Sequence, residues 1–376
     1  MFFNIKIKIV AVFTFVTFTA LFFAQNGSTQ TKGETAGQKF KNIKVLTNMP
    51  VDQMGKVMNL VSASLGVNCN FCHIGDDFEK DGKKEKDAAR EMMKMTFELN
   101  KTHFEGRPEI SCNTCHSGHE HPMSVPNLSP KIEEGRPKQP DKKPAVDAIL
   151  AKYRAALGGE AKLDRVTSRT IKANRIEPDG KTIEPEEIWQ KANKLLVKTT
   201  YGKYFVAEGF DGKQAWKTGI SEKSSVKTDE TRHTTGLFID SEITVIALKS
   251  DEAEQIKREA EIFANPDLKI IYTKLDFRFV DKIDGKEVYL VTGTMVDGSR
   301  ERLYFDIVTG FLIRRVASTP TILGNFQYQV DYSDYKDFGG VKLPATIRFA
   351  VPNINWTRKI LDVKNNVNID DAQFMR

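Results

Sequence analysis

All four cysteines of this chain fall into two copies of one short signature, Cys-x-x-Cys-His, at residues 69–73 and 112–116. Two thiols three positions apart can form thioether bonds to the two vinyl groups on one edge of a porphyrin, and the histidine that follows can ligate the iron. The signature therefore predicts two covalent c-type haems, attached through Cys69, Cys72, Cys112 and Cys115 and ligated by His73 and His116.

Other uses of paired cysteines fit this chain less well. Zinc ribbons and redox dithiols also use Cys-x-x-Cys pairs. Zinc ribbons space their pairs by about 15 to 20 residues, and here the separation is about twice as large. A disulfide framework is typical of short secreted chains, whereas this chain has 376 residues and four cysteines. Haem attachment accounts for both cysteine pairs and for the histidine after each.

The first residues predict export from the cytoplasm. Lys6 and Lys8 precede an apolar run over residues 9–24, and polar residues follow it. The run has about 16 residues, which is shorter than the roughly 20 that a membrane-spanning helix needs. Residues 1–24 are therefore expected to be a signal peptide, which places the protein in the periplasm or cell envelope.

A methionine-bearing helix is predicted ahead of each signature. The first covers about residues 51–65 and the second about residues 87–100, and each has an apolar stripe at helical spacing. The stripes consist of Met54, Val57, Met58, Val61 and Leu65 in the first helix and Ala88, Met92, Met95 and Leu99 in the second. Such methionines ordinarily fill cores, but beside a haem a thioether sulfur can be the second axial ligand. Periodicity alone does not choose among them.

Residues 41–128 resemble the photosynthetic reaction centre cytochrome c subunit family, and segments 53–60, 89–95 and 112–118 carry the resemblance. In that family a methionine from the helix before the motif ligates the iron. The resemblance implies that Met58 and Met92 do so here, with Met54 and Met95 as reserves. The family carries four haems and this chain has motifs for two, so the resemblance implies a haem module rather than a photosynthetic role.

A proline-rich, charged stretch over residues 129–144 predicts a linker that ends the haem module. A helix is expected over residues 145–157 and another over residues 251–262. The remainder reads as antiparallel strands joined by Asp-Gly turns, at residues 179–180, 211–212, 284–285 and 297–298. Aspartates and glutamates are expected at turns and exposed strand positions, and no catalytic group stands out.

Residues 145–376 resemble the outer-membrane lipoprotein carrier superfamily in the segments 304–306, 309–312, 331–335 and 342–344. The resemblance implies an open half-barrel with helices in its concavity, able to hold acyl chains. Five aromatic residues either line such a cavity or fill the core of the sheet: Trp189, Phe205, Phe210, Trp216 and Phe277.

The expected fold class is multidomain: a small α-helical dihaem module at 41–128, then a mostly antiparallel β, half-barrel-like α+β domain at 145–376. The expected function is electron transfer between a redox protein donor and acceptor, membrane-bound partners included, without catalysis. Nothing in the sequence indicates nucleic-acid binding. Two alternatives are a binder of lipid or another hydrophobic ligand, with the haems as redox input, and a dihaem peroxidase-type enzyme.

Overall fold

The computed structural model describes residues 34–122, 139–140, 142–202, 204–220, 243–247, 251–264 and 267–375. The predicted signal peptide and most of the predicted linker lie outside these residues. The chain divides into two compact units, Met1–Met54 and Gly55–Arg376. The expected division into a haem module and a β-rich domain stays a prediction. Among the described helices, none has the length and apolar character needed to cross a membrane.

The first unit contains two short helices, α1 (Ala36–Lys39) and the 3-10 helix η1 (Val51–Gln53). Backbone hydrogen bonds join the segment around α1 to the one before η1, because the Ala36 N–H donates to the Met49 carbonyl at 2.7 Å. Ala36 and Met49 are both fully buried. This pairing satisfies backbone polar groups of a buried segment.

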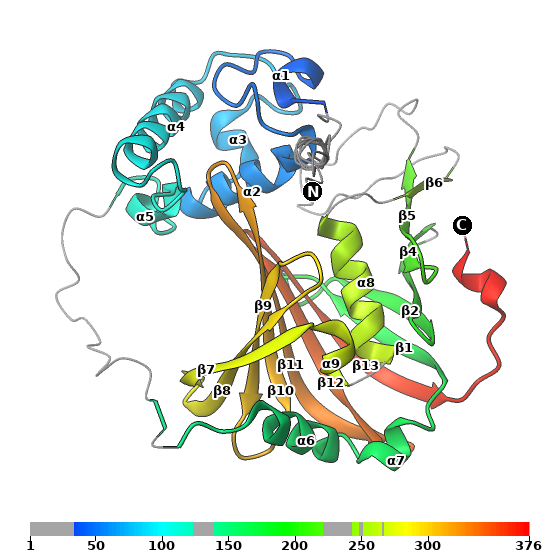
Figure 1. Cartoon of the computed structure of the whole chain (residues 1–376). Coiled ribbons are helices and arrows are strands. Elements are labelled where there is room, and N and C mark those ends of the chain that lie inside the picture. Colours follow the sequence, from blue (N-terminus) through cyan, green and yellow to red (C-terminus); the bar gives the residue numbers. More distant parts are fainter. Residues whose placement is uncertain are drawn as a thin grey trace, which may run out of the picture. The chain divides into compact units, whose positions relative to one another are not determined.

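Four helices follow: α2 (Met54–Leu65), α3 (Cys69–Cys72), α4 (Lys84–His103) and α5 (Cys112–His116) (Figure 1). Both methionine-bearing helices are confirmed, and α4 extends beyond its expected bounds at each end. Gly66 ends α2 with φ +68°, and a Cβ there would lie 2.2 Å from the Gly118 carbonyl oxygen. Only glycine permits this close approach of two loops.

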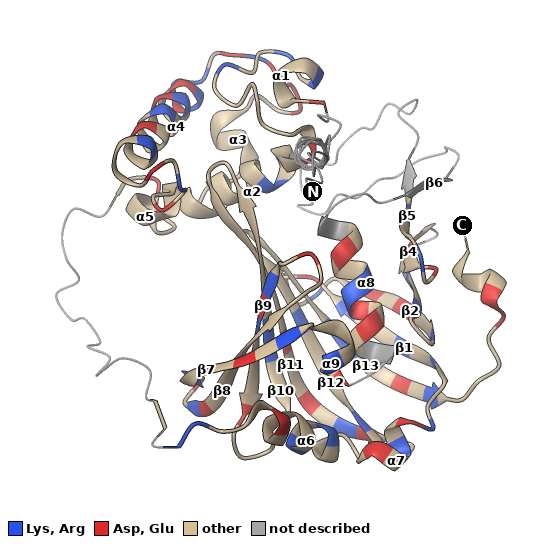
Figure 2. Cartoon of the chain, in the orientation of Figure 1, with Lys and Arg blue, Asp and Glu red and all other residues tan. Residues whose placement is uncertain are grey.

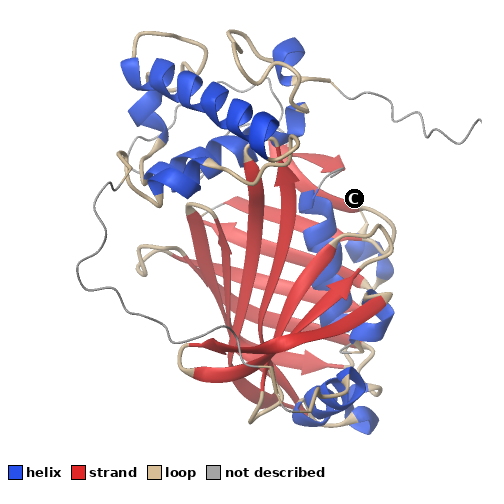
Figure 3. Ribbon diagram, turned by 60° about the vertical axis from the view of Figure 1, so that its left-hand side comes forward, coloured by secondary structure: helices blue, strands red, loops and turns tan. Residues whose placement is uncertain are grey.

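Within the described residues the rest of the chain forms one 13-stranded antiparallel sheet with four helices around it (Figure 3). The sheet order is β6-β5-β4-β3-β2-β1-β13-β12-β11-β10-β9-β8-β7. The helices are α6 (Val146–Ala156), α7 (Glu160–Leu163), α8 (Asp251–Ala264) and α9 (Leu268–Ile271). The strands are β1 (Ser168–Ile176), β2 (Ile183–Lys191), β3 (Lys194–Tyr201), β4 (Tyr204–Phe210), β5 (Ala215–Ile220), β6 (Ile243–Ala247), β7 (Lys274–Ile283), β8 (Lys286–Thr294), β9 (Arg300–Asp306), β10 (Leu312–Thr321), β11 (Gly324–Phe338), β12 (Val341–Val351) and β13 (Ile354–Asn365).

All four Asp-Gly turns join neighbouring strands as expected. Asp284 and Gly285 both have positive φ, 50° and 78°, which gives the two-residue hairpin that matches strand twist. The Asp179 carboxylate accepts hydrogen bonds from the Lys181 and Thr182 amides, each at 2.8 Å, and from the Thr182 hydroxyl at 2.6 Å. The Thr182 hydroxyl contributes most to lowering the pKa of Asp179 to about 2. The predicted helix at 251–262 corresponds to α8.

Helix α8 crosses a face of the sheet because β6 and β7, consecutive in sequence, lie at opposite edges. Figure 3 shows the sheet curving around this helix. On α8, Ile256 and Ala260 pack into a core with Ile188 of β2 and Ile347 of β12. A second core joins α6, α7 and α9 to β7–β12. The concave face is thus filled by the protein's own helices.

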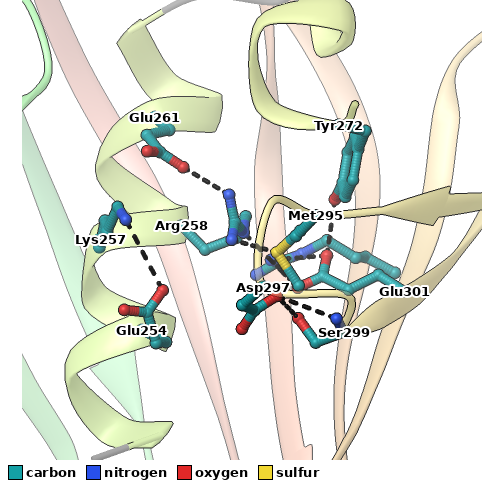
Figure 4. Close-up of polar contacts among 10 residues, drawn as sticks. Glu254, Lys257, Arg258, Glu261, Tyr272, Met295, Asp297, Ser299 and Glu301 are labelled. Atoms are coloured by element: carbon teal, nitrogen blue, oxygen red, sulfur yellow. Dashed lines mark hydrogen bonds and ion pairs between the residues drawn. The ribbon is translucent and has the colours of Figure 1, made fainter. Parts of the chain in front are cut away.

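Charged side chains are buried where α8 meets the sheet, contrary to the expectation that acidic residues lie at turns and exposed positions. The Arg358 guanidinium is fully buried, lies 2.6 Å from Glu186 and also pairs with Glu259 of α8. Figure 4 shows a neighbouring cluster in which Arg258 pairs with Glu261. Glu301, also buried there, accepts a 2.6 Å hydrogen bond from the Tyr272 hydroxyl. In this cluster Arg315 pairs with Glu301 at 3.2 Å.

The five singled-out aromatics mostly fill cores. Phe210 and Phe277 belong to the two cores on the concave face. Trp189 and Trp216 pack on the opposite face against the C-terminal 3-10 helix η2 (Asp371–Phe374), and the Trp216 indole donates to the Phe374 carbonyl at 3.0 Å. Phe205 is 40% exposed. The cavity-lining interpretation is therefore not needed for Trp189, Phe210, Trp216 and Phe277, which all pack into cores.

Candidate functional site

Each Cys-x-x-Cys pair lies on a helix of a single turn. In α3 the three-residue spacing places Cys69 and Cys72 on the same side, because residues three apart on a helix are neighbours. The helix ends at His73, whose amide donates to the Cys69 carbonyl at 3.0 Å while its backbone returns to extended geometry. The chain therefore leaves the helix at the histidine, one residue after the second thiol.

The second motif is similar, but its histidine, His116, is still part of the helix α5, which ends there. Ser111 begins α5, and its amide donates to the Thr114 hydroxyl at 3.0 Å. After His116 the chain turns through Ser117 (φ 50°) and Gly118 (φ 87°). This turn brings the His119 carbonyl oxygen to 3.0 Å from His116 Nδ1. A metal-ligating histidine usually donates its second ring nitrogen in this way, which leaves Nε2 free for a metal.

His73 has different surroundings. Its Nδ1 atom is buried. The Phe78 ring packs edge-on against it, with ring centroids 5.2 Å apart. Burial lowers the pKa of His73, and the nearby Lys86 ammonium lowers it further. Neutral imidazole is the form that ligates iron, so these surroundings suit a ligand.

The methionines divide between helix faces. On α2, Val57 lies on the buried face with Leu60 and Ser64. The other members of the predicted stripe are half-buried: Met54, Met58, Val61 and Leu65. On α4 the buried face consists of Met93, Thr96 and Asn100, whereas the predicted stripe is open: Met92 is 44% exposed, Met95 46% and Leu99 36%. Exposed apolar side chains at helical spacing mark a face that fits an apolar group.

Helix α4 contacts both motif helices, α3 and α5. Its position depends on Asn100, which sequence reasoning missed. The Asn100 amide group donates to the Ile110 carbonyl at 2.7 Å and accepts from the Ile110 amide at 2.8 Å. Because Asn100 is buried, these bonds fix α4 against the segment that enters α5. An asparagine late in a helix gives no sequence signal for such a role.

The four thiols fit covalent attachment better than metal binding. All four are free, and Cys69 and Cys115 are exposed. Burial raises the pKa of Cys72 and of Cys112, opposite to the shift that favours a reactive or metal-bound thiolate. Among the described residues no three His, Cys, Asp or Glu side chains gather into a metal site. The two pairs therefore do not converge on one ion, and each is combined with its own histidine.

One cavity in the sheet, of about 50 Å³, lies among α6, α7, α8 and β10–β12. Apolar and tyrosine side chains form most of its wall, together with Arg169 and Glu259. A cavity of this size has room for about three to five water molecules. It is far smaller than an acyl chain.

Two single-turn Cys-x-x-Cys-His helices, carried by a small group of helices ahead of a large antiparallel sheet, define a chain with features of c-type cytochromes. Residues 12–151 match the family model of the photosynthetic reaction centre cytochrome C subunit. The resemblance seen in the sequence of the haem-motif region is thereby confirmed.

Curated relatives agree with the family model. The chain is 32% identical over 99 residues to the photosynthetic reaction center cytochrome c subunit of Rubrivivax gelatinosus, which covers 25% of this chain and 26% of that protein. It is 33% identical over 82 residues to cytochrome c-554 of Chloroflexus aurantiacus, covering 20% of each. The chain therefore spans about a quarter or less of the length of these relatives.

Among solved structures, similar chains include a LolA superfamily protein from Nitrosomonas europaea, with a TM-score of 0.39 and 14% identity. The alignment covers 61% of this chain and 97% of that one. An outer membrane lipoprotein-sorting protein domain from Vibrio parahaemolyticus has a TM-score of 0.38 and 8% identity, covering 61% and 94%. Likeness of this degree says nothing about function.

Proposed function

We propose that the protein is an exported dihaem c-type cytochrome that carries electrons between a redox protein donor and acceptor in the periplasm or cell envelope. The observation that carries the proposal is the repeated single-turn helix that presents two thiols and ends on a histidine. It occurs twice within a segment similar to cytochrome c subunits. Membrane-bound partners fit the reaction centre relatives.

The chain's own residues would hold each haem in four ways. Cys69 with Cys72, and Cys112 with Cys115, form the thioether bonds. His73 and His116 would hold iron through Nε2, and for His116 the His119 carbonyl fixes the ring by accepting from Nδ1. Met58 and Met92 would each supply a thioether sulfur to one of the irons. The bound haem supplies reversible one-electron chemistry, and the surrounding side chains exclude water and set its potential.

Methionine ligation of both irons, as proposed, would leave no open iron position for peroxide, so this ligand set favours an electron carrier over the alternative of a peroxidase-type enzyme. The second alternative, a hydrophobic ligand in the sheet, has less support. The described part of the concave face is occupied by α8 and by buried charges, and the cavity there is about 50 Å³. No residue of the chain is proposed as catalytic.

A redox-titrated absorption spectrum of the exported protein is the direct test. We expect two haems per chain, which are oxidised and reduced reversibly without added substrate. The ferric spectrum should contain the charge-transfer band of sulfur-ligated iron. A pyridine haemochrome assay on the same sample gives the count. One haem or none would contradict the proposal, and a high-spin ferric spectrum would favour the enzyme.

Met92→Ala is expected to abolish sulfur ligation at one haem, because a methyl group replaces the thioether. Met95→Ala is the matched control, since Met95 lies on the same open stripe of α4 and is almost equally exposed. The measurement is the ferric charge-transfer band, which should fall to about half in the first variant and stay intact in the second. The reverse result would make Met95 the ligand.

A further inference from the structure

A lysine ammonium is built into the structure beside the histidine of the first motif. Lys86 Nζ donates to the carbonyl oxygens of Phe78 at 3.0 Å and Lys80 at 2.8 Å, and lies 3.4 Å from Asp81. The Lys86 side chain is only 11% exposed. The Phe78 residue that accepts from Lys86 also packs its ring on His73. The cation is therefore held close to the imidazole by a dedicated loop.

Helix stability does not explain this position. Lys86 lies in the first turn of α4, where the helix dipole disfavours a cation. Three oxygen acceptors from the loop at residues 78–81 offset that effect. The placement thus serves something other than the helix.

The acidic partners of Lys86 and Arg90 are more exposed than the two cations themselves. Arg90, 12% exposed, lies 2.9 Å from Asp81 and 2.8 Å from Asp87. These two carboxylates are 38% and 65% exposed, so water screens them more than the cations they pair with. Burial lowers the pKa of His73 most, Lys86, Arg90 and Lys83 lower it further, and a hydrogen bond with the Phe78 backbone raises it.

At the second motif the neighbour of the histidine ring is an uncharged backbone group. His116 Nδ1 faces the neutral carbonyl oxygen of His119 at 3.0 Å. Donation from Nδ1 to a carbonyl makes the imidazole a stronger donor to iron and stabilises the ferric state. A cation behind the ligand acts in the other direction and stabilises the ferrous state, which carries one positive charge less.

We propose that Lys86 raises the reduction potential of the iron ligated by His73 above that of the iron ligated by His116. An electron shared between the two sites then resides mainly at the first motif. This inference rests on the proposed dihaem function and makes Lys86 a positioning residue for charge, not a ligand.

The test is a spectroelectrochemical titration of the full holoprotein, compared with Lys86→Met, Lys86→Arg and Lys94→Met. The wild type should show two resolved midpoint potentials. Lys86→Met should shift only the higher one downward, and Lys86→Arg should retain the separation. Lys94 is the control because it carries the same charge on α4 but is 58% exposed, next to Glu91. Its removal should leave both potentials in place.

Two further measurements show which motif has which potential. They also test the inference if Lys86→Met does not fold. A Cys112→Ala/Cys115→Ala protein should retain the higher potential. In the wild type the separation should persist at high salt, since a buried cation is weakly screened. Four results would each overturn the inference. In the wild type these are equal potentials, or a separation that disappears at high salt. In the variants they are retention of the lower potential by the Cys112→Ala/Cys115→Ala protein, or a shift of the lower potential in Lys86→Met. A haem count below two would instead overturn the proposed function.

Discussion

Replacing Cys112 and Cys115 by alanine is expected to halve the covalently bound haem, from two per chain to one. The thioether bonds require both thiols of a motif, and each pair lies on its own helical turn with its own histidine. The measurement is haem absorbance per protein after removal of non-covalent haem. Replacing Cys69 and Cys72 should give the same half value, and replacing all four should remove covalent haem entirely.

A matched control is Asn113→Ala, which changes an exposed residue between the same two cysteines and should leave the haem content at two. The outcome that contradicts the attachment sites is unchanged covalent haem in either double variant. Zinc in stoichiometric amount, found by elemental analysis of the wild type, would instead restore the metal-ribbon interpretation of the four thiols.

Arg358→Met is expected to lower the free energy of unfolding of the sheet by about 3–5 kcal/mol, because it leaves buried carboxylates without a counter-charge. Arg358 is fully buried on β13 and pairs with Glu186 of β2 and Glu259 of α8. All three tryptophans, Trp189, Trp216 and Trp356, lie in strands of the sheet. Denaturant unfolding followed by tryptophan fluorescence therefore reports on this part of the chain.

Arg348→Met is the control, since Arg348 is 48% exposed and lies 3.7 Å from Asp331. Exposed pairs contribute about 0–1 kcal/mol, so the two variants should differ several-fold. Neutralising both acids as well, in Arg358→Met/Glu186→Gln/Glu259→Gln, should recover much of the loss. Equal effects of Arg358→Met and Arg348→Met would mean that the buried cluster is solvated.

Local chemistry made much of the fold predictable. The Asp-Gly turns, the ends of α2 at Gly66 and of α6 before Gly158, and the span of α8 each follow from a few adjacent residues. Other hairpins lack that signal. Ala192 adopts φ 49° and Asn353 φ 67° in turns where the sequence has no Asp-Gly pair. Those positive φ values are imposed by the pairing of the flanking strands.

The buried positions of some charged side chains depend on residues that are distant in the sequence, so they could not be predicted. Arg358 lies two residues from both Trp356 and Ile360 on β13, so all three point to the same face of the sheet. Because Trp356 and Ile360 pack toward the concave core, the strand pattern also places Arg358 inward, where a charge is not expected. The buried charge of Arg358 is compensated by the carboxylates of Glu186 and Glu259, which are both far from it in the sequence. Figure 2 shows the same mixture of charges along α8 and α4, and the sequence alone does not separate the buried Lys86 from its exposed neighbours.

On the haem side, spacing alone identified the cysteine pairs and their histidines as candidates. It did not identify the buried face of α4. The sequence stripe of Met92, Met95 and Leu99 is open, and a mixed face of Met93, Thr96 and Asn100 is buried instead. Polar residues can form that face because Asn100 finds both of its partners on the backbone of Ile110.

The order of strands in the sheet sets a sequence of events during synthesis and export. Strands β1–β6 pair as neighbours, as do β7–β13, and β1 with β13 joins the two halves. Arg169 and Asn365, paired there, are 196 residues apart. Each half can therefore assemble from local contacts, but the joining pair must wait for the last strand, and such non-local pairing is slow.

The two cysteine motifs lie far upstream of that last strand. In a chain that crosses a membrane from its N-terminus, the thiols would be accessible while β13 has yet to arrive. The enzymes that attach haem would then act on a short, locally folded segment, and closure of the sheet would complete a protein already loaded with its cofactor.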